Sequence, residues 1–260
     1  SSDNSVWMNA HLSPATYATS IEIKSGHEIS VSTNTNVSSV IVTPGAKLTL
    51  SNGNTLTATN GITLQSSTSG TATFVDNNNT SPQAVTGTVE QHLASARNWY
   101  LSSPIAGATI PSGQTYYSYD ETGSNAGFVA PATLYWVAVP EGTAINPMKG
   151  YITQPGAATT KSYTGTFNTG TKTIALTRTN SAVKPGFNLV ANPYPSYLDW
   201  SMVDTTAANI QTSVWYRTKT SGGAYTFDTY NGKLDVATAN GENTVSKLIP
   251  PMQAFWVRVK

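Results

Sequence analysis

The sequence predicts an all-β protein, in which a short N-terminal β-solenoid-like stack is followed by an internally duplicated β-sandwich. Apolar and polar residues alternate in short runs along the chain, as they do in half-buried strands. Near the N-terminus such runs recur about every 20 residues, which is typical of stacked coils. Nearer the C-terminus, a pair of motifs each occur twice, which indicates a duplication.

A change in composition predicts two domains, at residues 1–95 and 96–260. Only three aromatic residues precede residue 96, namely Trp7, Tyr17 and Phe74, although aromatic residues make up 10% of the chain. Aromatic side chains bury large areas, so they are expected to supply the core between the sheets of the second domain.

The repeat in the first domain involves residues 21–31, 40–50 and, more loosely, 62–74. The first two segments are related by a shift of 19 residues, from Ile21 to Val40. One coil cannot bury its apolar face alone, whereas stacked coils can. The hairpin signals Asn52-Gly53 and Asn60-Gly61 favour a meander of hairpins instead, so the sequence leaves both arrangements open, with the solenoid preferred.

The duplication in the second domain is visible in two pairs of segments. Residues 100–104 (YLSSP) match 189–193 (LVANP), and residues 145–151 (INPMKGY) match 249–255 (IPPMQAF). Proline ends a strand because it cannot donate to the ladder, and methionine fills irregular space beneath a turn. Each half is expected to run from a strand through a proline corner and a Pro-Met turn to a closing strand.

Short strands separated by turn residues are expected throughout the second domain. They cover residues 99–101, 115–119, 134–139, 150–153, 172–176, 187–191, 213–217, 225–230 and 254–259. The aromatic pair Tyr135-Trp136 is expected to correspond to Trp215-Tyr216. One short helix is predicted over residues 199–209, with Asp199 as its N-cap.

The composition excludes several classes of partner. Charged residues are 10% of the chain and the net charge is +1, against the ~25% charged residues of average domains. The sequence has no cluster of basic residues of the kind that binds a phosphate backbone, so no nucleic-acid partner is expected. No apolar run approaches the ~18 residues that span a membrane, so no membrane span is expected.

The absence of cysteine removes thiol catalysis and cysteine-ligated zinc, and with abundant Thr, Asn and Gly it fits an exported bacterial protein. Residues 1–7 (SSDNSVW) contain no basic and apolar leader, so any signal peptide is expected to have been removed.

No catalytic pattern stands out, so the protein is expected not to be an enzyme. His11, His27 and His92 lack metal-ligand spacing, and His27 is expected to be a solvated turn residue. Glu22 and Glu28 alternate outward from apolar positions. A glycan-active enzyme on the solenoid would need two such carboxylates at glycosidase spacing, and it is the third hypothesis for function.

No cofactor is expected, with one exception at residues 75–80 (VDNNNT). This segment is rich in oxygen donors, so Asp76 is a candidate ligand for calcium. It lacks the acidic spacing of an EF-hand loop, and an asparagine-rich turn is the preferred interpretation.

Tyrosine rings are the candidates for contact with a glycan. Tyr194 and Tyr197 lie in the proline corner, and Tyr116 lies on the opposite strand face from its neighbours Tyr117 and Tyr119. Tryptophans in the strand motifs are expected to belong to the core instead; these are Trp99, Trp136, Trp215 and Trp256.

Residues 186–200 (GFNLVANPYPSYLDW) and 249–259 (IPPMQAFWVRV) resemble motifs of large exported proteins of Bacteroidetes. Those motifs read W-N-L-V-x-N-P-Y-P and I-x-P-x-Q-A-F-W-V, and such surface or adhesin-like proteins often leave the cell by the type IX secretion route. The resemblance covers about residues 97–259. In the first copy it departs from the pattern at Trp99-Tyr100 and Ser102-Ser103, and the chain shows no recognisable sorting tail at Lys260.

The resemblance implies a bacterial protein that is extracellular or on the outer cell surface and takes part in cell adhesion, and it transfers no catalytic residue. Asp204-Thr205-Thr206 also resembles the tripeptide at which Bacteroidetes O-glycosylate exported proteins, which would make Thr205 the modified residue.

The expected function is therefore that of a non-catalytic extracellular surface protein, a structural or adhesive module whose ligand is an unknown glycan or protein. The alternative is a carbohydrate-binding module that uses Tyr116, Tyr194 and Tyr197.

Overall fold

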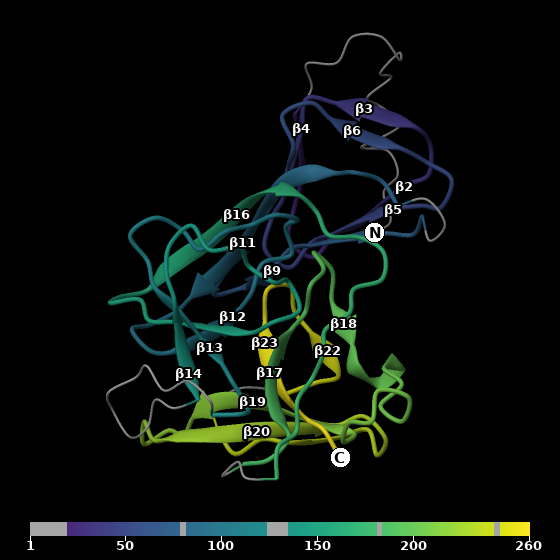
Figure 1. The fold of residues 1–260 in the computed structure, drawn as a ribbon. Coiled ribbons are helices and arrows are strands. Elements are labelled where there is room, and N and C mark those ends of the chain that lie inside the picture. The colour runs from purple at the N-terminus through teal and green to yellow at the C-terminus, as the bar shows by residue number, and fades with distance from the viewer. Residues whose placement is uncertain (1–19, 79–81, 124–134, 181–183, 242–244) are drawn as a thin grey trace. The chain divides into compact units, whose positions relative to one another are not determined.

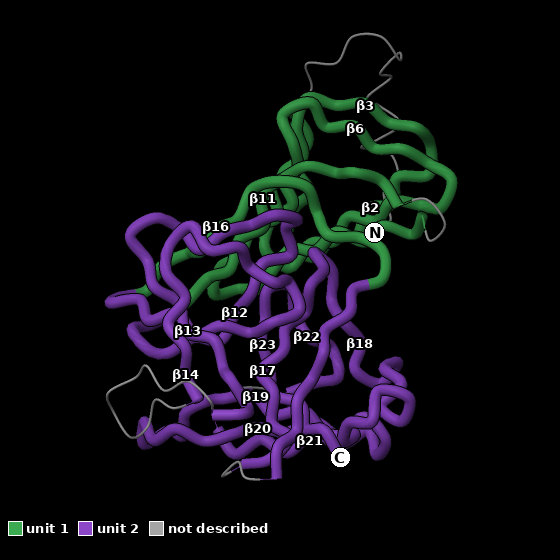
Figure 2. The backbone as a smooth tube through the Cα atoms, viewed as in Figure 1, with its two compact units in different colours: residues 1–94, 158–171 green, residues 95–157, 172–260 purple. Residues whose placement is uncertain are grey.

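The computed structural model describes residues 20–78, 82–123, 135–180, 184–241 and 245–260 (Figure 1). Throughout these ranges the protein is all-β, and their only helical element is the single 3₁₀ turn η1 (Trp200–Met202). Figure 2 shows two compact units, one of residues 1–94 and 158–171 and one of residues 95–157 and 172–260.

The first unit is a β-solenoid, because its successive coils pair in parallel. Each coil contributes to up to three sheets, and the third coil is interrupted by the small hairpin of β8 (Ser66–Ser67) and β9 (Gly70–Thr71). The first sheet contains β1 (Ser20–Ile23), β4 (Ser39–Val42), β7 (Ile62–Leu64) and β11 (Thr86–Leu93). The second contains β2 (Glu28–Val31), β5 (Lys47–Leu50) and β10 (Thr73–Asp76), and the third β3 (Thr35–Val37) and β6 (Leu56–Ala58).

The strand register confirms the solenoid and excludes the meander. Ile21 pairs with Val40, which in turn pairs with Ile62, so the predicted 19-residue shift is the first coil-to-coil step. Parallel neighbours need a crossover and cannot be joined by a tight hairpin. Asn52-Gly53 and Asn60-Gly61 therefore turn the chain from one sheet of a coil to the next.

Aliphatic side chains fill the interior of the coils. Leu48, Leu50, Ile62 and Leu64 are fully buried, and the residues that alternate with them lie closer to the surface. Stacking thus buries one face of the strands that carry these side chains, which is the physical basis of the repeat.

An antiparallel strand that the sequence did not predict, β16 (Thr159–Thr166), closes the solenoid sheet. It pairs with β11 along its whole length, from Thr86–Thr166 to Leu93–Thr159. Phe167 then packs on Phe74 with ring centroids 5.7 Å apart. Residues 95–157 of the second unit are therefore inserted, in chain order, into what is otherwise a β-hairpin of the first.

The second unit contains two antiparallel sheets with the same strand order. One sheet runs β12 (Trp99–Leu101), β15 (Tyr151–Thr153), β13 (Tyr116–Tyr119), β14 (Trp136–Val139). The other runs β17 (Phe187–Ala191), β23 (Ala254–Arg258), β19 (Ser213–Lys219), β20 (Tyr225–Asn231), β21 (Val236–Thr238). Each sheet therefore places its first strand beside its last, followed by its second and third, as a duplication requires. The short strands β18 (Leu198–Asp199) and β22 (Leu248–Ile249) pair separately.

The two halves also exchange equivalent hydrogen bonds. The Ser102 amide donates to the Met252 carbonyl, and the Ala191 amide donates to the Met148 carbonyl, both at 2.9 Å. Ser102 corresponds to Ala191, and Met148 to Met252, in the predicted sequence match. The first strand of each half thus meets the Pro-Met turn of the other half, in a pseudo-twofold arrangement.

Aromatic and aliphatic side chains form the core between the two sheets. Trp256 is at its centre, with the Tyr119 ring centroid at 4.7 Å and that of Tyr100 at 5.9 Å. Trp136 and Trp215 pack against this cluster, which confirms their predicted place in the core. A second cluster, which includes Trp200 and Phe255, covers the other face of the β17–β23–β19 sheet.

Three predictions for this unit were wrong in detail, and two of them concern strands. Trp136 lies on the third strand of its half and Trp215 on the second of its own, so the two aromatic pairs are not equivalent. Residues 172–176 form no strand, although Ile174 and Leu176 pack against the core.

The third concerns the helix predicted over residues 199–209, which is reduced to η1. Asp199 caps it as expected, and its Oδ1 accepts from the Ser201 amide. The helix stops because Asp204 captures the amides of Thr206 and Ala207 in a new turn, and such local bonds compete with helix continuation.

Candidate functional site

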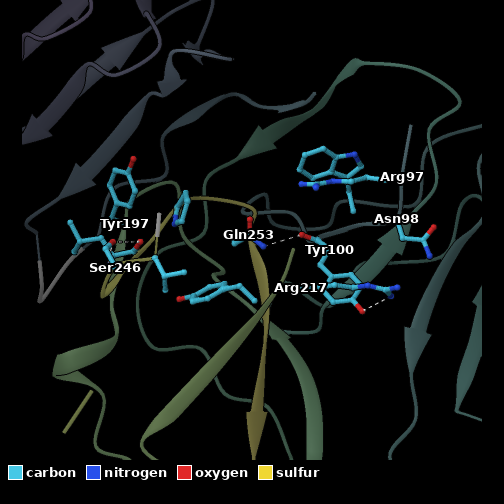
Figure 3. Close-up of a pocket in the computed structure, with 12 residues that line it drawn as sticks. Arg97, Asn98, Tyr100, Tyr197, Arg217, Ser246 and Gln253 are labelled. Carbon is cyan, nitrogen blue, oxygen red and sulfur yellow. Dashed lines mark hydrogen bonds between the residues drawn. The ribbon is translucent and has the colours of Figure 1, made fainter. Parts of the chain in front are cut away.

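The second unit contains a pocket of about 490 Å³, which we call the Tyr197 pocket (Figure 3). This volume is in the range of small-ligand sites, ~300–1,000 Å³. The walls of the pocket are formed by the start of β12, the proline corner, β19 and the segment before β23. The lining residues are Arg97, Asn98, Trp99, Tyr100, Tyr197, Tyr216, Arg217, Val245, Ser246, Leu248, Pro250 and Gln253.

Two guanidinium groups stacked on aromatic rings are the charged groups of the pocket. The Arg97 guanidinium lies 3.8 Å from the centroid of the Trp99 ring, and that of Arg217 lies 4.0 Å from the Tyr225 ring. Arg217 Nη1 also donates to the Tyr100 hydroxyl at 3.3 Å. No carboxylate is among the described residues that line the pocket, and the charged side chains among them are both arginines.

Two tyrosine hydroxyls of the pocket, those of Tyr100 and Tyr216, have a raised pKa and are neutral at physiological pH. Burial raises the pKa of Tyr100, and the Arg217 guanidinium offsets part of this rise. Burial raises the pKa of Tyr216 further. The Tyr216 hydroxyl is buried and has no hydrogen-bond partner among the residues that the structure describes, which leaves a polar group of the pocket lining unsatisfied.

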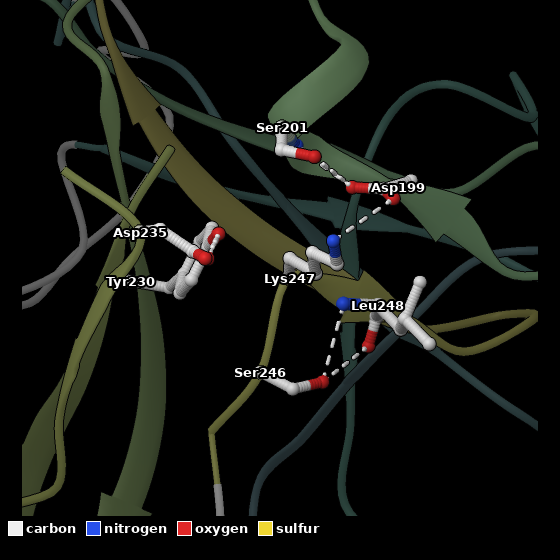
Figure 4. Close-up of polar contacts among 7 residues, drawn as sticks. All are labelled: Asp199, Ser201, Tyr230, Asp235, Ser246, Lys247 and Leu248. Carbon is white, nitrogen blue, oxygen red and sulfur yellow. Dashed lines mark hydrogen bonds and ion pairs between the residues drawn. The ribbon is translucent and has the colours of Figure 1, made fainter. Parts of the chain in front are cut away.

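One wall of the pocket is held by a small polar network (Figure 4). Ser246 Oγ accepts from the Leu248 amide at 3.1 Å, and the Lys247 ammonium lies 3.8 Å from Asp199 Oδ2. The hydrogen bond from the Ser201 hydroxyl, together with its amide and Lys247, lowers the pKa of Asp199. The Asp199 carboxylate is therefore already paired when a ligand arrives.

The Asn-Pro corner is anchored by a buried amide that the sequence did not single out for this role. Asn192 is fully buried, and its Nδ2 lies within hydrogen-bond distance of the carbonyls of Ser196, Ile249 and Pro250, at 2.7–3.1 Å. It ties the proline corner, which carries Tyr197, to the turn that carries Pro250. The motif is therefore architectural, and it also positions two walls of the pocket.

The three tyrosines predicted to contact a glycan have different environments. Tyr197 lines the pocket and is 44% exposed. Tyr194 is half-buried and outside the pocket lining, and burial raises its pKa. Tyr116 was a candidate because one face of its strand was expected to show a ring to solvent. It is 0% exposed, because its face of β13 packs toward Tyr151.

Trp99 also differs from expectation, since it was assigned to the core but is half-buried and lines the pocket. Its Nε1 donates to the Ser95 carbonyl at 2.9 Å, which fixes the ring beneath Arg97. A tryptophan two residues after an arginine, at the start of a strand, is the sequence signal that could have revealed it.

The remaining candidates, Thr205 and Asp76, do not line the Tyr197 pocket. Thr205 is half-buried beside a separate pocket of about 280 Å³. The Asp76 carboxylate accepts from the amides of Asn78 and Gln83, so it organises its own turn. No group of three metal-ligating side chains occurs among the residues that the structure describes.

Two acidic residues of the solenoid, Glu22 and Glu28, form surface ion pairs. Glu22 pairs with Lys24 at 2.7 Å and Glu28 with Lys47 at 2.6 Å. The depression on this unit, of about 710 Å³, is lined by residues 56–63 and 83–88 and by Thr164, none of which is Asp or Glu. His27 is exposed beside its turn, as predicted, and His11 lies outside the described residues.

These features define an all-β protein that contains a β-solenoid and a duplicated antiparallel sandwich with a pocket lined by aromatic rings and two arginines. The chain belongs to the family described as Domain of unknown function (DUF8693), whose profile matches residues 2–260. No curated protein and no solved structure gives a significant match. Among the described residues, no helix is long and apolar enough to cross a membrane.

Proposed function

We propose that this protein is a non-catalytic module of a bacterial outer surface that binds glycans through the Tyr197 pocket and so acts in adhesion. The observation that carries the proposal is the composition of the pocket, in which an exposed tyrosine ring adjoins amide and guanidinium donors. The family resemblance to exported surface proteins supports the location, and export by the type IX route is included in the proposal.

The pocket contains the two kinds of group that a sugar requires. A pyranose presents C–H groups that pack on an aromatic face and hydroxyls that hydrogen-bond to polar side chains. Tyr197 and Trp99 supply rings, and Asn98, Ser246 and Gln253 supply donors and acceptors. A few polar groups in a partly apolar concavity are the usual composition of a small-ligand site.

The motifs that carry the resemblance also build the pocket. Tyr197 belongs to the segment 186–200, and Pro250 and Gln253 belong to the segment 249–259. Both segments that carry the resemblance therefore contribute lining residues to the pocket, and Gln253 is also a fixed position of the motif I-x-P-x-Q-A-F-W-V.

A glycan array tests the proposal directly. The wild-type protein is expected to bind a subset of the array, and Tyr197→Ala to reduce that binding about tenfold or more, because the platform for the sugar ring is lost. Phe227→Ala is the matched control, since Phe227 is also an exposed aromatic residue of this unit but does not line the pocket. An array without a hit, or equal binding by wild type and Tyr197→Ala, contradicts the proposal.

The proposed lack of catalysis is tested with the glycans that bind. Prolonged incubation is expected to release no new reducing ends, because no carboxylate is among the described residues of the pocket lining to act as acid or base. Hydrolysis that disappears when a single Asp or Glu is replaced by its amide would show an enzyme instead.

A further inference from the structure

We infer that the ligand of the Tyr197 pocket is an acidic glycan, whose sugar carries a carboxylate or a sulfate group. This inference rests on the proposed glycan-binding function and narrows its ligand class. It is carried by the charges that line the pocket and by the way in which Arg217 is held.

The charge of the pocket is concentrated and of one sign. Arg97 and Arg217 both line it, and none of the other described lining residues is charged. The net charge of the whole chain is only +1, with 14 basic and 13 acidic residues. Two guanidinium groups, with no acidic residue among the other described lining residues, therefore stand out against the composition of the chain, and positive charge of this kind attracts an anion.

Arg217 is held in place by neutral groups. It stacks on Tyr225 and donates one hydrogen bond to Tyr100, which is a neutral phenol. Within the described ranges, the ion pairs of Glu22, Glu28 and Asp199 are made with lysines and not with Arg217. Arg217 is half-buried, so its positive charge lies where water screens it less than at a fully exposed site.

The stacked guanidinium has the geometry that an oxyanion needs. A guanidinium is planar, and its edge carries N–H donors in a fork that matches a carboxylate or a sulfate. Stacking on an aromatic ring covers the face of the group and leaves that edge available. Arg217 is thus preorganised for bidentate recognition. Asn98 and the side-chain oxygen of Gln253 line the same pocket and can bond neutral hydroxyls of the sugar, whereas Gln253 Nε2 already donates to the Ala254 carbonyl.

A neutral glycan would leave this charge uncompensated. Asp199, on the wall beside the pocket, already pairs with Lys247 and accepts a hydrogen bond from Ser201. Its carboxylate therefore does not neutralise the charge of Arg217. An acidic sugar supplies the missing counter-charge, and burying a charged group is favourable only when it is paired.

The experiment uses the full chain and polymers that differ in charge alone. Polygalacturonate is compared with its methyl ester, and dextran sulfate with dextran, by affinity electrophoresis and on an array of neutral, carboxylated and sulfated glycans. The expected result is binding to the carboxylated or the sulfated members, with affinity that falls as NaCl is raised from about 50 to 500 mM. The two polymer pairs distinguish a carboxylate from a sulfate.

Substitution of Arg217 tests the site itself. Arg217→Gln is expected to weaken binding of the acidic polymer about tenfold or more, and Arg217→Lys to recover only some of it, because the fork is lost. Lys233→Gln removes the same charge from an exposed position of this unit outside the pocket lining, and it is expected to bind like wild type. Thermal melts verify that each variant is folded.

The outcomes separate the two proposals. Equal or tighter binding of the neutral polymers, or acidic binding that Arg217→Gln leaves intact, overturns the acidic ligand and leaves a glycan-binding function in place. Absence of binding to every neutral and acidic glycan overturns the proposed function and the acidic ligand together. If Arg217→Gln proves unfolded, the comparison of charged and neutral polymers on the wild type still decides the inference.

Discussion

At the scale of single residues, one buried amide and one ion pair hold together segments that are distant in the sequence. Asn192 joins the proline corner to the turn before β23 through three carbonyls. Asp199 joins η1 to the segment of Lys247. Both residues flank the Tyr197 pocket, so the stability of the walls and the shape of the site are linked.

Replacement of Asn192 is predicted to be strongly destabilising. Asn192→Ala removes the amide and leaves buried carbonyls unsatisfied, so the free energy of unfolding is expected to fall by about 2–4 kcal/mol. Denaturant unfolding measures the change. Asn36→Ala, at an exposed strand position, is expected to change it by less than about 0.5 kcal/mol. A similar effect of both substitutions would show that Asn192 does not anchor the corner.

The lowered pKa of Asp199 predicts that the stability of the protein depends on pH. Its pKa is lower in the folded protein than the ordinary aspartate value of 3.8, so its ionised form stabilises the fold. That contribution is complete above the unfolded pKa and is lost as the pH falls through the lower, folded pKa. Thermal melts between about pH 6 and 2.5 should therefore show an acid-dependent component that Asp199→Asn removes. An unchanged pH profile in Asp199→Asn contradicts this assignment.

At the scale of elements, the protein depends on two different ways of closing sheets. In the solenoid, parallel coils stack so that each covers the apolar edge of the next. In the sandwich, each half completes the other, since the first strand of one meets the Pro-Met turn of its counterpart. The predictions at this scale test one packed position of each kind.

The solenoid core is predicted to be sensitive to cavities. Leu50→Ala removes a fully buried side chain between stacked coils and is expected to cost about 2–5 kcal/mol. Leu234→Ala, at a side chain that is 67% exposed, is expected to cost little. Chemical denaturation measures the free energy of unfolding of both variants. A small loss of stability in Leu50→Ala would contradict a tightly stacked interior.

The contact between the two halves of the sandwich is predicted to tolerate no added methyl group at Gly150. A Cβ there would lie 2.5 Å from Leu189 Cγ and 2.8 Å from Ala254 Cβ, and Ala254 is the residue that matches Gly150 in the other half. Gly150→Ala is therefore expected to lower the stability by about 1–3 kcal/mol. Gly156→Ala, where a Cβ would contact nothing within 4 Å, is the control and is expected to be neutral or slightly stabilising. Equal melting temperatures for the two variants would contradict the close approach.

At the scale of the whole molecule, the order of the chain differs from the order of the compact units. Residues 95–157 belong to the second unit, and the chain then returns to the solenoid with residues 158–171. The pairing of Leu93 with Thr159 means that only a tight turn is needed to join β11 to β16 directly.

This arrangement predicts that the solenoid can be isolated only together with β16. A chain of residues 1–93 and 159–171, joined by an Asn-Gly turn between Leu93 and Thr159, is expected to unfold cooperatively. Residues 1–94 alone leave the eight-residue strand β11 as an open edge and are expected to be less stable and prone to associate. Calorimetry and light scattering compare the two chains. A fragment of residues 1–94 that is as stable as the joined chain would contradict the role of β16.

The sequence by itself determined the class of fold, because alternation and a 19-residue repeat report directly which side chains face inward. It also revealed the duplication, because proline corners and Pro-Met turns are local. Only the tertiary structure showed that β16 returns to the solenoid, that Tyr116 is fully buried while Trp99 is half-buried, and that Tyr197 shares a pocket with Arg217. These facts depend on which distant strands pair, as with Leu93 and Thr159, and on which strand face is covered, and alternation along a single strand specifies neither.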